Sequence, residues 1–277
     1  MKKLVAITLL LATSAFGWGD PQNLGNPPNG TAWDFQSSID GAGNKIFFVS
    51  TRNTIGKIFV SECVGGSWTI PQELPSPINE PGSEHPFWDE VRNDLYFTSA
   101  DHGGYGGADL FVSHWNGSSW ETPQNLGPNV NTSAKEHGCC LSSNGNRIYF
   151  AREGIIYTAE KVSGNWVNVQ LTGVGDGSPT CYHDGYLWFA SNRVGGLGGS
   201  DIWRAQGEGT NFSTPQNLGP DVNTSSNEGY PSWTSDGRAM YFDSNRPGGF
   251  GSADLWRVCY YNAVTPTSFG QVKASYN

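Results

Sequence analysis

The stretch Trp120-Glu-Thr-Pro-Gln-Asn-Leu-Gly127 occurs five times in this chain in recognisable form. The copies start at Trp18, Trp68, Trp120, Trp166 and Phe212, so consecutive starts lie 50, 52, 46 and 46 residues apart. A self-similar unit of this length indicates stacked or radially arranged copies of one supersecondary motif. The sequence therefore predicts a repeat architecture built from five units.

Residues 83–127 show what one repeat contains. Four short segments are rich in aromatic and β-branched residues and are separated by Gly, Asn and Asp, as expected of strands; they cover residues 83–88, 95–99, 109–113 and 120–126. No window has a useful helical periodicity. Four antiparallel strands repeated radially form a β-propeller blade. We therefore predict an all-β fold, a five-bladed β-propeller of four-stranded antiparallel blades.

The fifth repeat lacks a good fourth strand, and two segments compete for that place. The copy at residues 18–25 has no strands before it, so it can supply the outer strand of blade five and close the ring, which protects exposed strand edges. Residues 264–270 keep part of the frame without its Trp and could pair there instead, or beside it. We favour the N-terminal copy. The expected propeller spans residues 18–262, and residues 263–277 form a tail or an extra edge strand.

The first seventeen residues predict a signal peptide. Lys2 and Lys3 precede a short apolar run, and small residues stand at positions 15 and 17, where a signal peptidase cleaves. We therefore expect a periplasmic or secreted protein without a membrane span. The formal net charge of −9 and the absence of a basic run argue against binding to nucleic acid or to an anionic membrane. We expect a monomer.

The chain has five cysteines, an odd number for an exported protein. At least one should stay free or pair outside the chain. Strand alignment places Cys140 and Cys181 on equivalent strands of neighbouring repeats, one register step apart. Two alternatives follow: a disulfide from Cys181 to Cys139 or Cys140, or reduced and buried thiols. For Cys63 and Cys259 the sequence indicates no partner.

Residues 191–203 and 235–256 share the frame Ser-Asn-Arg-x-Gly-Gly-x-Gly followed by an Asp and an apolar strand. These units resemble the WD-like propeller repeats of the TolB type, up to about Tyr261. TolB itself carries an extra N-terminal α/β domain and six blades, unlike this chain. The resemblance implies a bacterial envelope or secreted protein that acts by binding, although a shared fold is weak evidence for activity.

Meander topology brings several polar residues to one face of the predicted ring. That face carries the starts of the first strands and the loops between the second and third strands. Converging polar groups in a concave place are the usual setting for a ligand. The expected ligand-binding residues are Asp34, Glu84, His85, Glu136, His137, Glu228, Arg193 and Arg246, with Asp101 and His102 in the same loops.

The acids on this face have two interpretations. Five-bladed propellers are also the scaffold of arabinanase-like and invertase-like hydrolases, and that resemblance implies catalytic carboxyls at Asp34, Glu84 and Glu136, since glycoside hydrolysis needs two placed carboxyl groups. Alternatively, each acid belongs to the repeat and accepts hydrogen bonds from a neighbouring loop, because Glu228 recurs in blade five where a hydrolase needs none. We favour the second interpretation: a non-catalytic binding or scaffold protein that engages a protein or glycan partner. A glycoside hydrolase is the alternative.

No cofactor is expected. The Glu84–His85 and Glu136–His137 pairs carry metal-ligand types, but neighbouring residues of a strand point to opposite faces, so we expect no metal site there. Asp201 and Asp254 should accept loop N–H groups or pair with the loop arginines, and they could also hold a structural calcium ion. His183 lies beside a predicted turn and should be solvated. Rim aromatics could stack on sugars.

Overall fold

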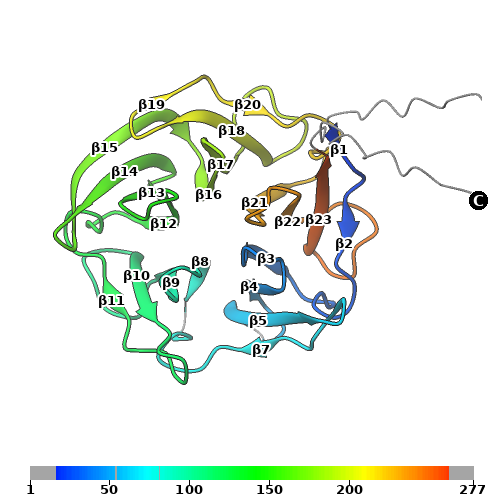
Figure 1. Ribbon diagram of the computed structural model, residues 1–277, viewed down its shortest axis with the longest axis horizontal. Coiled ribbons are helices and arrows are strands. Elements are labelled where there is room, and N and C mark those ends of the chain that lie inside the picture. The colour runs from blue at the N-terminus through cyan, green and yellow to red at the C-terminus, as the bar shows by residue number, and fades with distance from the viewer. Residues whose placement is uncertain (1–16, 54, 81, 262–277) are drawn as a thin grey trace, which may run out of the picture.

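The computed structural model of the protein describes residues 17–53, 55–80 and 82–261. Five small antiparallel sheets stand around a central axis (Figure 1). The predicted five-bladed β-propeller is therefore confirmed. No helix that could cross a membrane occurs within these described residues. The predicted signal peptide and the segment after residue 262 fall outside them, except for Gly17.

The blades follow one another along the chain, and each begins with its innermost strand. Blade one comprises β3 (Asp34–Ile39), β4 (Lys45–Ser50), β5 (Lys57–Val64), β6 (Ser67–Trp68) and β7 (Gln72–Glu73). Blade two comprises β8 (Glu84–Asp89), β9 (Asp94–Ser99), β10 (Asp109–His114) and β11 (Gln124–Asn125). Blade three comprises β12 (Glu136–Leu141), β13 (Arg147–Arg152), β14 (Ile155–Val162) and β15 (Asn165–Asp176). Blade four comprises β16 (Ser178–His183), β17 (Tyr186–Ser191), β18 (Asp201–Glu208), β19 (Asn211–Phe212) and β20 (Gln216–Asn217).

Blade five is assembled from both ends of the chain. Its inner strands are β21 (Glu228–Trp233), β22 (Ala239–Ser244) and β23 (Asp254–Tyr261). The outer edge is β1 (Gly17–Trp18) and β2 (Gln22–Asn23), which both pair antiparallel with β23. The predicted closure by the N-terminal copy is therefore confirmed. The competing segment 264–270 lies outside the described residues.

The repeated aromatic residue joins each blade to the blade before it. Its ring packs against the third residue of the preceding blade's second strand. The ring centroids are 6.3 Å apart for Trp120 and Phe47, and 5.7 Å apart for Phe212 and Tyr149. The other three blades make the same contact: Trp68 packs on Tyr241, Trp18 packs on Trp188, and Trp166 shares a core cluster with Tyr96. The repeated phrase therefore encodes the interface between blades as well as the outer strand.

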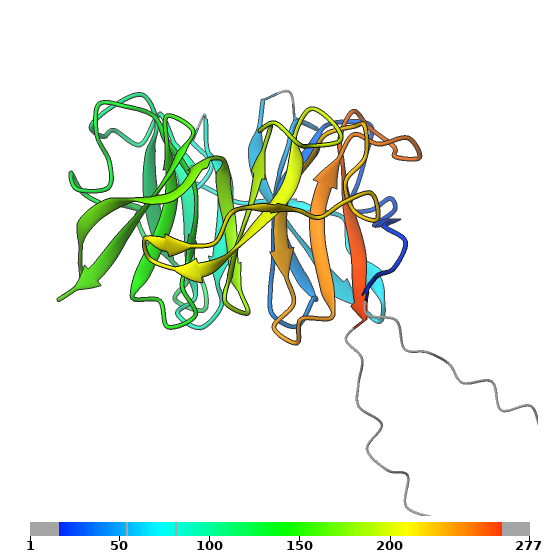
Figure 2. The ribbon, with the colours of Figure 1, turned by 90° about the horizontal axis from the view of Figure 1, so that it is seen from above.

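The strands run between two faces of the ring, which Figure 2 shows edge-on. The loop face carries the links between blades and the loops from second to third strands. The hairpin face carries the turns from first to second strands. Each face has a cavity.

All five cysteines lie in the described part of the chain and are free. Cys139 and Cys140 are buried, and burial raises the pKa of both thiols. The bridge from Cys181 to either of them is not formed, so the structure has the reduced, buried thiols that the sequence left open.

Candidate active site

Three of the expected site acids share one position in the repeat. Each pairs with the last residue of its neighbouring second strand: Asp34 with Ser50, Glu136 with Arg152, and Glu228 with Ser244. The side chains of Asp34, Glu136 and Glu228 are fully buried. We call these three the anchor carboxylates.

Glu136 shows how an anchor carboxylate is used. It accepts hydrogen bonds from the backbone N–H of Thr132 at 3.0 Å, from the Thr132 hydroxyl at 2.7 Å and from Nε of Arg152 at 2.8 Å. Glu228 accepts the equivalent bonds from Thr224, with Ser244 and Arg246 added. Asp34 accepts from Gly30 N–H and from Arg52. These carboxylates therefore hold the inter-blade links in place, and none is open to a substrate.

The side chains of the loop arginines are also largely buried. Arg246 donates to the backbone carbonyl of Val222, lies over the rings of Phe242 and Trp256, and has a side chain only 10% exposed. Arg52, Arg152 and Arg193 each make the same type of contacts. In blade two the place is taken by His102, whose Nε2 lies 2.6 Å from the Pro77 carbonyl. The expected ligand role of Arg193 and Arg246 is thus replaced by a structural one.

The loop aspartates are also occupied. Asp201 accepts the backbone N–H groups of Leu197 and Gly198 and the side-chain amide of Asn217, and Asp254 has the equivalent partners. Neither pairs with the loop arginine of its blade. Among the described residues, no group of three or more His, Cys, Asp or Glu is placed to hold a metal ion.

Glu84 differs from the anchor carboxylates. Glu84 pairs with Thr98, the next-to-last residue of the second strand, whereas each anchor carboxylate pairs with the last residue. The buried Ser83 therefore occupies the anchor position in blade two. The alignment of Glu84 with Asp34 and Glu136 is therefore wrong by one residue. The Glu84 side chain is 38% exposed and lies at the loop-face end of the first strands. Of the three implied catalytic acids, Glu84 alone is open.

A hydrogen-bonded group surrounds this end of the central axis. His85 Nε2 lies 2.9 Å from the Tyr230 hydroxyl and 3.1 Å from Gln36 Nε2, and its backbone N–H donates to Gln36 Oε1 at 3.0 Å. All three residues have a positive φ of 50–56° at a bulge between first and second strands. Such bulges re-aim side chains. The ring of His137 lies 5.2 Å from that of His85. We call this region the channel mouth.

Both histidines are neutral at neutral pH. Burial lowers the pKa of His85 well below its usual range and lowers the pKa of His137 to about 4. The 3.7 Å approach of His85 Nδ1 to Glu84 is therefore no charge pair. The Nδ1 atoms of His85 and His137 are buried and have no hydrogen-bond partner within the described chain. Unsatisfied buried polar atoms of this kind mark a place for a polar ligand or ordered water.

Asp243 is the site residue that sequence reasoning missed. It lies on β22 opposite Gly229 and accepts the backbone N–H of Gln36 at 2.8 Å. Burial raises the pKa of Asp243 to about 7, against the opposing effect of the Gln36 bond, and the charge of Glu228 adds to the rise. The signal was available: the matching positions in the other blades are Val49, Thr98, Ala151 and Ala190, so Asp243 alone breaks an uncharged pattern.

Asp243 opens onto a cavity of about 540 Å³ that blades three, four and five enclose on the loop face. Its lining includes His137, Glu153, Asp176, Ser178, Tyr230 and Asp243. Burial raises the pKa of Tyr230, and the nearby charges of Asp243 and Glu84 add to this. The structure thus places His137, Tyr230 and Asp243 in the lining of this cavity, while His85 and Glu84 lie near Tyr230 outside that lining. It leaves the anchor carboxylates outside this group, with Glu228 buried at the cavity border.

Known proteins resemble this chain in structure and not in sequence. No family model and no curated protein sequence matches it. A GH62 α-L-arabinofuranosidase domain from Coprinopsis cinerea is similar, with a TM-score of 0.57, 9% identity, and coverage of 89% of this chain and 98% of that one. A thermostable family-43 glycoside hydrolase has a TM-score of 0.57, 13% identity, and coverage of 84% and 91%. TolB from Acinetobacter baumannii has a TM-score of 0.52, 12% identity, and coverage of 83% and 54%.

At these identities the likeness shows a shared propeller fold. It supports the resemblance to TolB-type propellers at the level of the fold. It also corrects the expectation of a non-catalytic binding or scaffold protein, because hydrolases of the GH62 and GH43 families match over nearly their whole length, whereas TolB matches over about half.

Proposed function

We propose that the protein is a glycoside hydrolase whose reaction takes place at the channel mouth. The observation that carries the proposal is Asp243: a residue that lines a cavity large enough for a sugar, with a carboxyl group whose pKa burial raises to about 7. A general acid that protonates a glycosidic oxygen needs a raised pKa of this kind. The group is protonated in a large share of molecules at neutral pH.

The second carboxyl group is Glu84. It is exposed at the same mouth, and its charge reaches Tyr230 together with that of Asp243. Asp243 then donates its proton to the leaving oxygen, and Glu84 attacks the anomeric carbon or activates a water molecule. Tyr230 lies within reach of the charges of both acids and, with the neutral His85, offers hydrogen bonds to sugar hydroxyls. Because the similar arabinofuranosidases are propellers of this kind, arabinoxylan is the first substrate to test.

The test uses two substrates that differ in their leaving group. Asp243→Asn should lower the release of arabinose from arabinoxylan by roughly 10²–10⁴-fold. It should affect 4-nitrophenyl α-L-arabinofuranoside much less, since nitrophenolate leaves without a proton. Glu84→Gln should lower turnover of both. Activity on arabinoxylan should fall above about pH 7, as Asp243 loses its proton.

Asp176→Asn is the matched control. Asp176 lines the same cavity with a side chain 49% exposed, but it is bonded to Ser191 and Arg193 rather than to the group at the mouth. This variant should keep most of the activity. Wild-type protein that releases no sugar from arabinoxylan or related polysaccharides, or an Asp243→Asn variant with unchanged turnover, would contradict the proposal.

A further inference from the structure

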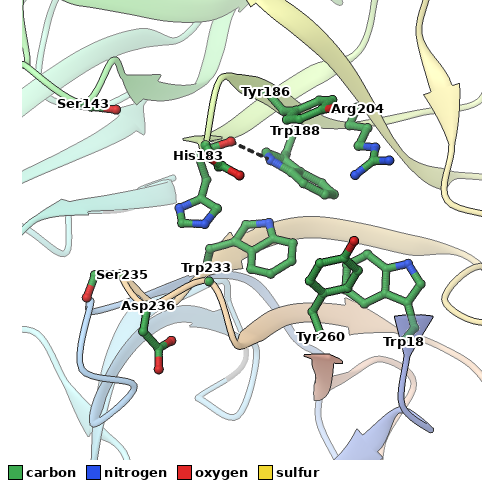
Figure 3. Close-up of a pocket in the computed structure, with 12 residues that line it drawn as sticks. Trp18, Ser143, His183, Tyr186, Trp188, Arg204, Trp233, Ser235, Asp236 and Tyr260 are labelled. Carbon is green, nitrogen blue, oxygen red and sulfur yellow. Dashed lines mark hydrogen bonds between the residues drawn. The ribbon is translucent and has the colours of Figure 1, made fainter. Parts of the chain in front are cut away.

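A second cavity of about 630 Å³ lies on the hairpin face between blades four and five, away from the channel mouth (Figure 3). Side chains of both blades line it, and Trp188 and Trp233 are in contact there. Blade four contributes Tyr186, Trp188 and Arg204, and blade five contributes Trp233, Tyr260 and, from its N-terminal strand, Trp18. We call it the aromatic cavity.

The aromatic rings are held in a fixed arrangement. Ring centroids lie 4.8 Å apart for Trp18 and Tyr260, 5.5 Å for Trp18 and Trp233, and 4.9 Å for Trp188 and Trp233. His183, which the sequence placed in solvent, stacks parallel on Trp233 at 5.1 Å, and burial lowers its pKa. These contacts leave Trp18 and Tyr260, like Tyr186 across the cavity, only partly buried.

The aromatic cavity also offers both kinds of hydrogen-bonding group. The turns of the hairpin face place the exposed carboxyls of Asp184 and Asp236 at its edge. The indole N–H of Trp233, a residue only 8% exposed, has no partner within the described chain, and neither has Nε of Arg204. Buried donors are normally satisfied, so these two call for a polar partner or water.

We propose that the aromatic cavity binds an uncharged sugar unit of a polysaccharide. A sugar ring presents a flat C–H face that suits Trp and Tyr, and its hydroxyls both donate and accept hydrogen bonds. The lining has donors and acceptors and carries charges of both signs, which suits a neutral ligand better than an anion or a cation. The grooves between blades five and one and between blades one and two also carry aromatic and charged residues. Among the described residues, neither groove is lined by a buried donor that lacks a partner, which sets the aromatic cavity apart.

This site goes beyond the proposed reaction and does not depend on it. A sugar bound on the hairpin face would hold the polymer to the protein whether or not the channel mouth cleaves it. The two proposals can therefore fail separately: Asp243→Asn tests cleavage, and the variants below test binding.

Native gel electrophoresis of the full mature chain in gels containing soluble arabinoxylan measures the binding. Arabinoxylan should retard the wild type, and Asp243→Asn equally. Tyr186→Ala and, separately, Asp184→Asn should weaken the retardation, by at least about ten-fold in apparent Kd for Tyr186→Ala, a loss of about 1.4 kcal/mol. Asp184 has a φ of 50°, which Asn tolerates, so that variant should fold normally.

Trp115→Ala is the matched control, since Trp115 lines the aromatic groove between blades one and two and its ring packs on Trp120 at 5.2 Å. It should bind like the wild type. Unchanged retardation of both Tyr186→Ala and Asp184→Asn would overturn the proposal. So would equal loss in Trp115→Ala, or retardation by polygalacturonate in place of arabinoxylan, which would indicate an anionic ligand. Urea unfolding of each variant separates lost binding from lost folding.

Discussion

The anchor carboxylates and the acids of the channel mouth lie on one face of one ring, yet they have opposite properties. Glu136 and Glu228 recur at one repeat position, are fully buried and are neutralised by arginines. Glu84 and Asp243 have no counterparts at their positions in the other blades, and both reach solvent. In a protein of repeats, an acid that every blade could use serves the ring, whereas an acid that breaks the pattern is the better candidate for chemistry.

The largest effect should come from removing an anchor. Glu228→Ala leaves the guanidinium of Arg246, only 10% exposed, without its charge partner. Breaking a buried ion pair in this way costs about 3–5 kcal/mol of the free energy of unfolding. Glu84→Ala removes a partly exposed side chain with no such partner and should cost less than about 1 kcal/mol. Urea titration followed by tryptophan fluorescence measures both.

The comparison fails if the two variants lose similar stability. Glu136→Ala tests the comparison at a second anchor. It should lose about as much free energy of unfolding as Glu228→Ala, because Arg152 loses its charge partner in the same way. Loss of sugar release in any anchor variant that remains folded would place that anchor in the chemistry after all.

The fold could be read from the sequence because its determinants are local and repeated. The phrase at Trp120 recurs often enough to count five blades, and the spare copy at Trp18 identifies the strand that closes the ring. Turn residues and short aromatic runs then give the bounds of the three inner strands of blade two to within one residue, whereas its predicted outer strand 120–126 is only Gln124–Asn125 in the structure. Closure of the ring also brings together residues far apart in sequence, such as Trp18 and Trp188.

The candidate site could be read only in part. Ser83-Glu84-His85 and Lys135-Glu136-His137 look alike in sequence, but the ladder puts Ser83 and Glu136 at one position. One residue of register exchanges a buried acid for an exposed one. The same bulge follows in blades one, two, three and five, so residue type alone misaligned Glu84. The contact of Asp243 with Gln36 joins residues 207 positions apart, which no local pattern encodes.

A second prediction builds an anchor where the chain has none. Blade two has Ser83 in the anchor position and His102 in place of the arginine. Ser83→Glu should cost about 2–3 kcal/mol, because it buries a carboxylate without a cation. Adding His102→Arg should restore much of that loss, and the double variant should be more stable than the sum of the single changes by about 1–3 kcal/mol.

The same urea titrations measure this cycle. His102→Arg alone serves as its control and should be mildly destabilising, since it brings a charge without a partner. Additive losses in the double variant would mean that the anchor does not depend on its arginine, and the distinction between the two sets of acids would lose its physical basis.

A further effect concerns the pH dependence of stability at the mouth. The pKa of Asp243 is raised to about 7 in the folded protein, from about 4 in an unfolded chain. Between these values the folded protein holds a proton that the unfolded chain has released, so the contribution of Asp243 to stability falls as the pH rises through this window and is lost above it. Relative to Asp243→Asn, the wild type should lose up to about 1.4 kcal/mol from pH 5 to pH 6.

The variant is needed because the histidines act in the opposite direction. Burial lowers the pKa of His85 and His137, so their contribution to stability grows with pH up to about 6.5 in both proteins and cancels in the difference. Urea unfolding of both proteins at pH 5, 6 and 8 provides the measurement. If the difference between them does not change with pH, the Asp243 carboxyl titrates normally, and the channel mouth then lacks the protonated acid that separates it from the anchors.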